Sequence, residues 1–218
     1  GMYDPKFVSL FESFEEDGIP EGWTTVDADN DGRTWKVFNK SSLEHIGTPF
    51  FGDQMITSWA WDSEAFDPDN YLISPLLSDA AELNYWFAMN TAYPEHYQVV
   101  ASTTGNDIAD FTEVVIDETP EGIETRSMSK WYERTLPLPA GTKYVAFRHC
   151  DSSDGNYFFI DNVRIIKGTA TGIETVTADN KTVARKGIYN INGIKMDGEW
   201  ESMPKGVYVV DGKKKVKN

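Results

Sequence analysis

The segment LNYWFAMN, residues 83–90, places Leu83, Tyr85, Phe87 and Met89 at every second position. A period of two residues is typical of a β-strand with one buried face. Other short apolar segments recur between turn residues such as Gly, Pro, Asn and Asp; they are residues 6–14, 34–38, 54–61, 71–76, 97–101, 131–138, 144–149 and 157–166. Many short strands of this kind predict an all-β fold, an antiparallel β-sandwich of jelly-roll type.

The composition changes at residues 167–172, KGTATG, which is typical of a linker. We therefore predict two domains, residues 1–167 for the sandwich and residues 173–218 for a small C-terminal β module. In the second, Asn192-Gly193 and Asp211-Gly212 each separate two apolar runs, the strongest short signal for a hairpin. The module is expected to be a small β-meander with little core of its own.

The chain carries a net charge of −15, which bears on its partners. This charge repels nucleic acid and anionic membrane surfaces, so neither is expected to bind. No apolar run approaches the roughly 18 residues that span a bilayer, so membrane insertion is not expected. The single cysteine, Cys150, cannot form a disulfide within the chain.

The segment Asp27-Ala28-Asp29-Asn30-Asp31-Gly32 has the chemistry of a calcium loop. Carboxylates at every second position can all point to the centre of a curling loop, and the glycine allows a backbone turn with positive φ. Such close negative charges repel each other unless a cation lies among them, and oxygen ligands favour Ca²⁺. The twelfth position is Phe38 instead of a bidentate Glu, so further ligands must come from elsewhere in the chain.

Signals for catalysis are weak. The three histidines, His45, His96 and His149, lack the spacing of a transition-metal site. Cys150 follows His149, but neighbours on a strand point to opposite faces and cannot form a catalytic dyad. There is no glycine-rich phosphate loop and no Gly-x-Ser-x-Gly elbow. Carboxylate counts alone do not decide about glycoside hydrolysis in so acidic a chain. We expect no enzymatic activity.

Trp59 and Trp61 are candidate ligand-binding residues, because positions two apart on a strand share one face. If that face meets solvent, two indoles form a platform on which sugar rings stack. If it is buried, both belong to the core, which is the more usual arrangement for one face of a strand.

Several blocks, read in order, resemble the cleaved-adhesin domains of gingipain proteases and related bacterial haemagglutinins. The resemblance covers residues 10–166 and is carried by FESFE (11–15), GIPEGW (18–23), PDNYLISP (68–75), EHYQVVASTTGND (95–107), WY (131–132), LPAGTKYVAFRH (138–149) and FIDNV (159–163). Near the C-terminus, YNING (189–193) and KGVYVV (205–210) resemble the short β modules of type IX secretion cargo.

The resemblance implies a calcium-bearing jelly roll, with the metal where the first strand, the aspartate loop and the last strand meet. The implied ligands are Glu15, Asp27, Asp29, Asp31 and the remote carboxylate of Asp161, with Ser13 and Arg33 adding backbone carbonyls. Glu15-Glu16-Asp17 is one residue longer than the commoner spacing, so Glu15 and Glu16 remain alternatives. The number of calcium ions is also left open.

The resemblance further implies a secreted or bacterial cell-surface protein that works in adhesion. We therefore expect a non-catalytic, calcium-binding adhesin that attaches to host or matrix proteins or to surface glycans. The alternative is a carbohydrate-binding module, accessory to a secreted enzyme, that uses Trp59 and Trp61. The sequence does not identify the ligand or the oligomeric state, nor whether the C-terminal module is a sorting signal.

Overall fold

The structure is a computed structural model that describes residues 6–42, 47–89, 95–121, 130–153, 155–168, 187–190, 195–196, 198–210 and 213–217. The chain divides into two compact units, Gly1–Thr171 and Gly172–Asn218. Within the described ranges, no helix is long and apolar enough to cross a lipid bilayer. The helices there are single 3₁₀ turns, Lys40–Ser42, Ile108–Asp110 and Trp200–Ser202.

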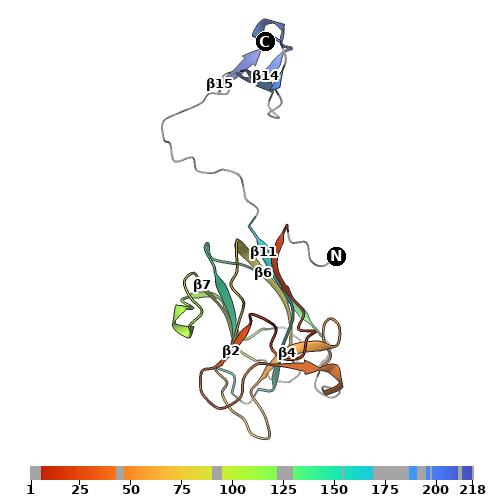
Figure 1. Ribbon diagram of the computed structural model, residues 1–218, viewed down its shortest axis with the longest axis vertical. Helices are drawn as coiled ribbons and strands as arrows, with labels where there is room; N and C mark the ends of the chain where they lie inside the picture. Colours follow the sequence, from red (N-terminus) through yellow and green to blue (C-terminus); the bar gives the residue numbers. More distant parts are fainter. Residues whose placement is uncertain are drawn as a thin grey trace. The chain divides into compact units, whose positions relative to one another are not determined.

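The first unit contains two antiparallel sheets (Figure 1). The larger sheet has the order β3-β4-β11-β6-β9, and β1 also pairs with β11. Its strands are β1 (Val8–Glu12), β3 (Lys36–Asn39), β4 (Gln54–Trp59), β6 (Ala80–Met89), β9 (Tyr132–Pro137) and β11 (Tyr157–Lys167). The first and last strands of the domain therefore lie side by side, as a jelly roll requires.

The smaller sheet has the order β2-β5-β10-β7-β8. Its strands are β2 (Thr24–Asp27), β5 (Asn70–Ile73), β7 (Tyr97–Ser102), β8 (Glu113–Glu118) and β10 (Tyr144–His149). In Figure 1, β2 and β7 of this sheet lie to the left of β4, β6 and β11.

The core lies between the two sheets. The alternating segment forms β6, and its Leu83, Tyr85 and Phe87 are fully buried in the main apolar cluster. Tyr85 packs edge-on against Phe147 of β10 with ring centroids 4.9 Å apart, which joins the sheets. The prediction of an antiparallel jelly-roll sandwich is thus confirmed; it followed from many short strands between turn residues, of which this two-residue period is the clearest example.

The second unit is a four-stranded antiparallel sheet in the order β13-β12-β14-β15. Its strands are β12 (Ile188–Asn190), β13 (Lys195–Met196), β14 (Gly206–Val210) and β15 (Lys213–Lys217). A simple meander would pair β13 with β14, but here β12 takes that place and pairs with both. Ile188, Met203 and Tyr208 form a small core. The predicted turn residues 192–193 and 211–212 lie outside the described residues.

Candidate metal centre

The aspartate loop follows β2 directly. Asp27, the last residue of β2, accepts hydrogen bonds at its carboxylate from the backbone N–H of Gly32 at 2.8 Å and of Asp31 at 3.3 Å. Asn30 and Gly32 have φ of 59° and 85°, the left-handed conformation that curls the chain back on itself. The loop is therefore closed by its own first carboxylate.

The three alternate carboxylates converge. Asp27, Asp29 and Asp31 each place an oxygen so that these atoms lie within 4.8 Å of one another. Burial and a hydrogen bond with Asp27 raise the pKa of Asp29. Burial works against a low pKa at Asp27, but hydrogen bonds from the Gly32 N–H and from Asp29 outweigh it and lower that pKa. The opposite pKa shifts of Asp27 and Asp29 reflect the closeness of their carboxyl groups, and a cation between them would favour the ionised form of both.

Arg33 lies at the edge of this cluster. Its guanidinium Nη1 is 3.2 Å from the Asp31 carboxylate, and its backbone N–H donates to the same side chain at 2.7 Å. Its guanidinium also lies 4.1 Å from the centre of the Phe66 ring. The side chain of Arg33 therefore compensates part of the cluster's negative charge.

Glu15 contacts a different segment, the residues that lead into β4. Its carboxylate accepts hydrogen bonds from the backbone N–H of Asp53 at 3.0 Å and of Gln54 at 3.2 Å. The side chain of Gln54 donates in return to the Glu15 carbonyl at 2.9 Å. Glu16 is exposed, so of the two alternatives it is Glu15 that lies against the fold. Phe14, with φ of 56°, makes the turn after β1.

Asp161 faces the same segment from β11. It is fully buried, and its carboxylate accepts hydrogen bonds from Phe51 N–H at 3.0 Å and Asn162 N–H at 2.7 Å. Burial raises the pKa of Asp161 to about 7; these hydrogen bonds oppose the rise, and the charge of Glu15 adds to it. The side-chain amide of the buried Asn162 has no hydrogen-bond partner. A cation beside Glu15 and Asp161 would offset the cost of ionising both carboxylates.

The predicted ligands thus form two groups. Asp27, Asp29 and Asp31 lie together with Arg33, whereas Glu15 and Asp161 are not part of that 4.8 Å cluster and lie at residues 51–54. Ser13 immediately precedes the turn at Phe14, on the Glu15 side.

Sequence reasoning missed the backbone of residues 51–54 and the carboxylate of Glu12, which accepts from the Phe14 N–H at 2.6 Å. The Glu15–Asp53 contact spans 38 residues and the Asp161–Phe51 contact spans 110, and no local pattern carries that information.

The two tryptophans have different environments. Trp59 is 8% exposed, lies 6.0 Å from Phe38 between ring centroids, and is covered by the Lys36 ammonium at 5.3 Å. Trp61 lies beyond the end of β4 and is 43% exposed. The pair does not form a joint exposed platform, because the strand ends between its two members.

The sequence model of the Cleaved Adhesin Domain matches residues 7–165. Over 196 residues, 83% of this chain, the sequence is 40% identical to Lys-gingipain W83 and to Hemagglutinin A of Porphyromonas gingivalis. This alignment covers 11% and 9% of those proteins, so the chain spans about a tenth of the length of these two curated relatives.

Solved structures give the same result. The K1 cleaved adhesin domain of Lys-gingipain from P. gingivalis W83 is 40% identical and superposes with a TM-score of 0.65, covering 73% of this chain and 98% of that domain. The K2 domain of Lys-gingipain matches with the same identity and TM-score over 72% of this chain. The matched region coincides with the two-sheet unit that carries both acidic groups. This chain belongs to the Cleaved Adhesin Domain family.

Proposed function

We propose that this chain is a non-catalytic, calcium-binding adhesin module that works outside the cell, secreted or on a bacterial surface. Two observations support the proposal: membership of the adhesin family, and the convergence of three carboxylates at the aspartate loop. The second carries the calcium part, because three acids within 4.8 Å of one another repel unless a cation separates them.

The residues present fit a hard cation with oxygen ligands. Asp27, Asp29 and Asp31 offer carboxylate oxygens on a loop that its own hydrogen bonds already curl. If the site binds as extracellular calcium modules do, Kd is about 0.1–1 mM, and millimolar calcium stabilises the fold by about 0.4–1.4 kcal/mol. The larger effect of the ion is to order the loop by removing the repulsion among its acids.

The group at residues 51–54 supports a second calcium position. Glu15 and the buried Asp161 meet there from the first and last strands, and the Asn162 amide beside them has no hydrogen-bond partner. A cation would compensate both carboxylates and would join the ends of the domain through side chains as well as through β1–β11 pairing.

We propose host or matrix proteins as the attachment targets, by analogy with relatives named as haemagglutinins. A surface glycan is the alternative, and the exposed Trp61 is the observation that favours it. Trp59 contributes less to that alternative, since its indole is covered.

Adhesion assays with calcium or with excess EDTA test the proposal. The chain is applied to immobilised host proteins and to a glycan array, with Asp29→Asn and Trp61→Ala as variants. Calcium-dependent binding to proteins that Asp29→Asn weakens and Trp61→Ala leaves unchanged supports the adhesin. Binding to glycans alone, abolished by Trp61→Ala, supports the alternative. Hydrolysis of chromogenic glycosides by the chain would contradict both.

A further inference from the structure

A second group of ligand-type side chains lies on the smaller sheet, far from the acidic loops in sequence. His96 immediately precedes β7, and Cys150 immediately follows β10. The two strands are antiparallel, with Tyr97 opposite His149, so the register also brings His96 and Cys150 face to face. One ligand atom from each of His96, Cys150 and Asp151 lies within 4.8 Å of the others.

The distances in this group are somewhat longer than those around a tetrahedral zinc ion. The sulfur of Cys150 is 3.8 Å from Nδ1 of His96, and an oxygen of Asp151 is 4.0 Å from the same nitrogen. Zinc bond lengths at tetrahedral angles place sulfur about 3.5 Å and oxygen about 3.4 Å from the nitrogen. Reaching these values takes a shift of about 0.3 Å for the sulfur and about 0.6 Å for the oxygen. Cys150 is buried, while Asp151, with φ of 52°, is exposed at the turn.

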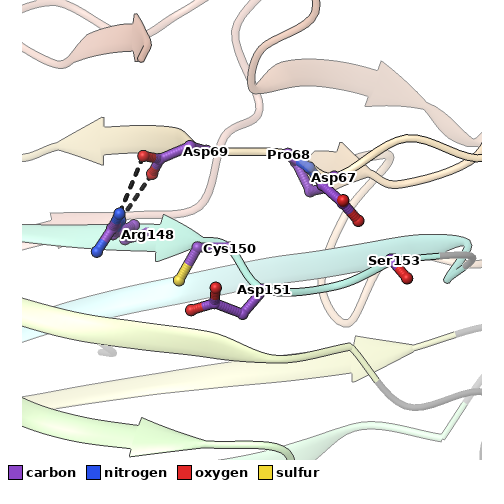
Figure 2. A pocket seen from close by; sticks show the side chains of 7 residues that line it. All are labelled: Asp67, Pro68, Asp69, Arg148, Cys150, Asp151 and Ser153. Atoms are coloured by element: carbon purple, nitrogen blue, oxygen red, sulfur yellow. Dashed lines mark hydrogen bonds and ion pairs between the residues drawn. The ribbon is translucent and has the colours of Figure 1, made fainter. Parts of the chain in front are cut away.

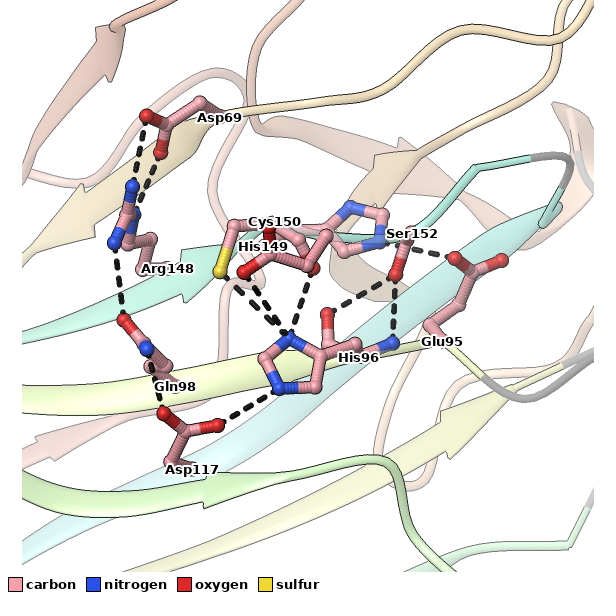
Figure 3. A network of polar contacts seen from close by, with 10 residues as sticks. Asp69, Glu95, His96, Gln98, Asp117, Arg148, His149, Cys150 and Ser152 are labelled. Carbon is pink, nitrogen blue, oxygen red and sulfur yellow. Dashed lines mark hydrogen bonds and ion pairs between the residues drawn. The ribbon is translucent and has the colours of Figure 1, made fainter.

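The imidazole of His96 is held from its other side. Its Nε2 lies 2.8 Å from the Asp117 carboxylate, whose pKa is lowered by hydrogen bonds from Gln98 and from His96 (Figure 3). An ionised carboxylate only accepts, so Nε2 carries a proton and donates it. A metal ion that binds this ring therefore binds it through Nδ1. A carboxylate that orients a ligating histidine in this way is a usual feature of zinc sites.

Further contacts fix the same geometry. The backbone N–H of His96 donates to Ser152 Oγ at 2.6 Å, and that hydroxyl donates back to the His96 carbonyl at 3.2 Å (Figure 3). Nδ1 also lies 3.0 Å from the carbonyl oxygen of Cys150, which can only accept, so any proton that Nδ1 donates there must leave when an ion binds. The start of β7 and the turn after β10 are therefore already tied together.

The group borders an open pocket of about 440 Å³ (Figure 2). Its lining includes three aspartates, Asp67, Asp69 and Asp151, and one arginine, Arg148. Arg148 is already engaged by both oxygens of Asp69, at 2.6 and 2.9 Å. The negative charges of Asp67 and Asp151 remain and favour a cation, and the opening of the pocket leaves room for water as a further ligand.

A nucleophilic role for the cysteine does not fit. Burial raises the pKa of Cys150 to about 12; Arg148 lowers it in part and Asp151 raises it. The thiol is therefore protonated and unreactive at neutral pH. His149 does not activate it, because that ring points into the sandwich, 2.8 Å from Ser58 and 3.1 Å from Glu95.

We propose that His96 Nδ1, Cys150 Sγ and the Asp151 carboxylate bind one zinc-type divalent cation, with water in the fourth position. Binding forms a metal–sulfur bond and releases the thiol proton to solvent. Nitrogen and sulfur ligands distinguish this site from the all-oxygen calcium loops. It is independent of the proposed adhesin function.

Cobalt(II) serves as the probe, because thiolate ligation gives it a sulfur-to-cobalt charge-transfer absorption. The full chain without an affinity tag is titrated with Co²⁺ in excess Ca²⁺, which occupies oxygen sites. We expect one equivalent to produce the band and Zn²⁺ to displace it. No band in the wild-type chain overturns the proposal without any variant.

Variants then test each ligand. Cys150→Ala and Cys150→Ser should lose the band, and Asp151→Asn should bind at least about tenfold more weakly. Asp67→Asn, in the same pocket but outside the ligand set, is the matched control and should bind as the wild type does. Equal weakening by Asp67→Asn and Asp151→Asn would overturn the assignment, since only pocket charge would then matter.

Asp117→Asn tests the positioning of His96. We expect affinity to fall about 10–100-fold with the charge-transfer band retained, because the ligands remain while the tautomer is no longer fixed. A merely structural role would lower the melting temperature of the metal-free chain and leave the affinity of the folded fraction unchanged. That result would remove Asp117 from the site.

Discussion

Replacing Asp161 by Asn should change how stability depends on pH. Asp161 is fully buried, and burial raises its pKa from 3.8 to about 7. The folded chain therefore keeps this proton to a higher pH than the unfolded chain does. The stabilising contribution is complete below about pH 4 and is lost as the pH rises through the folded pKa of about 7.

The magnitude follows from the size of the pKa change. At about 1.4 kcal/mol per pKa unit, a rise from 3.8 to about 7 removes about 4 kcal/mol of unfolding free energy between those pH values in the absence of calcium. The amide that replaces the carboxyl group in Asp161→Asn does not titrate. Its single carbonyl oxygen can accept from only one of the two N–H donors, Phe51 or Asn162. The lost hydrogen bond by itself lowers the unfolding free energy of the variant by about 1–3 kcal/mol at every pH.

Urea denaturation in EDTA at pH 4.5 and pH 8 measures both effects, the loss of the hydrogen bond and the pH dependence that Asp161 confers. At pH 4.5 the Asp161→Asn variant should be the less stable protein by about 1–3 kcal/mol. At pH 8, where Asp161 of the wild type is ionised, the variant should be as stable as the wild type or more stable. Calcium at ten times the Kd of the position at residues 51–54 should then stabilise the wild type by about 1.4 kcal/mol more than the variant, which keeps only the aspartate-loop site. If the unfolding free energies of the two proteins change with pH in parallel, the reasoning is refuted.

Three further predictions concern the loop, the core and an ion pair. Excess EDTA should lower the melting temperature and speed proteolysis at residues 27–33; Asp29→Asn should abolish the calcium effect on this proteolysis and reduce the calcium effect on the melting temperature. Phe158→Ala should cost about 3–5 kcal/mol in urea denaturation, because the fully buried ring packs against Tyr97 with centroids 4.6 Å apart. Arg148→Lys should lower the melting temperature, since lysine cannot make the two-pronged contact with Asp69; an unchanged value would show that this pair contributes little.

Local patterns in the sequence predicted a large part of the structure. The alternation of Leu83, Tyr85 and Phe87 is a property of consecutive residues, and it specified a strand whose alternate residues lie in the core; Asn84 and Ala88 on the other face are buried as well. The spacing of Asp27 and its neighbours likewise predicted carboxylates that converge. Both features are set by backbone geometry over fewer than about ten residues.

Contacts between distant strands could not be predicted in the same way. The meeting of Glu15 and Asp161 with residues 51–54 depends on sheet order, which the sequence alone does not specify. Scanning for histidine spacing likewise argued against a transition-metal site, whereas β7–β10 pairing places His96 beside Cys150 from 54 residues away. The separate environments of Trp59 and Trp61 arise because β4 ends at Trp59.

Isothermal titration of calcium into the chelator-stripped chain, beside the Asp29→Asn variant, measures the central property most directly. We predict saturable binding with Kd of about 0.1–1 mM, with one ion fewer bound by the variant. No calcium binding by the wild type, or an identical isotherm for the variant, would contradict a calcium site at the aspartate loop.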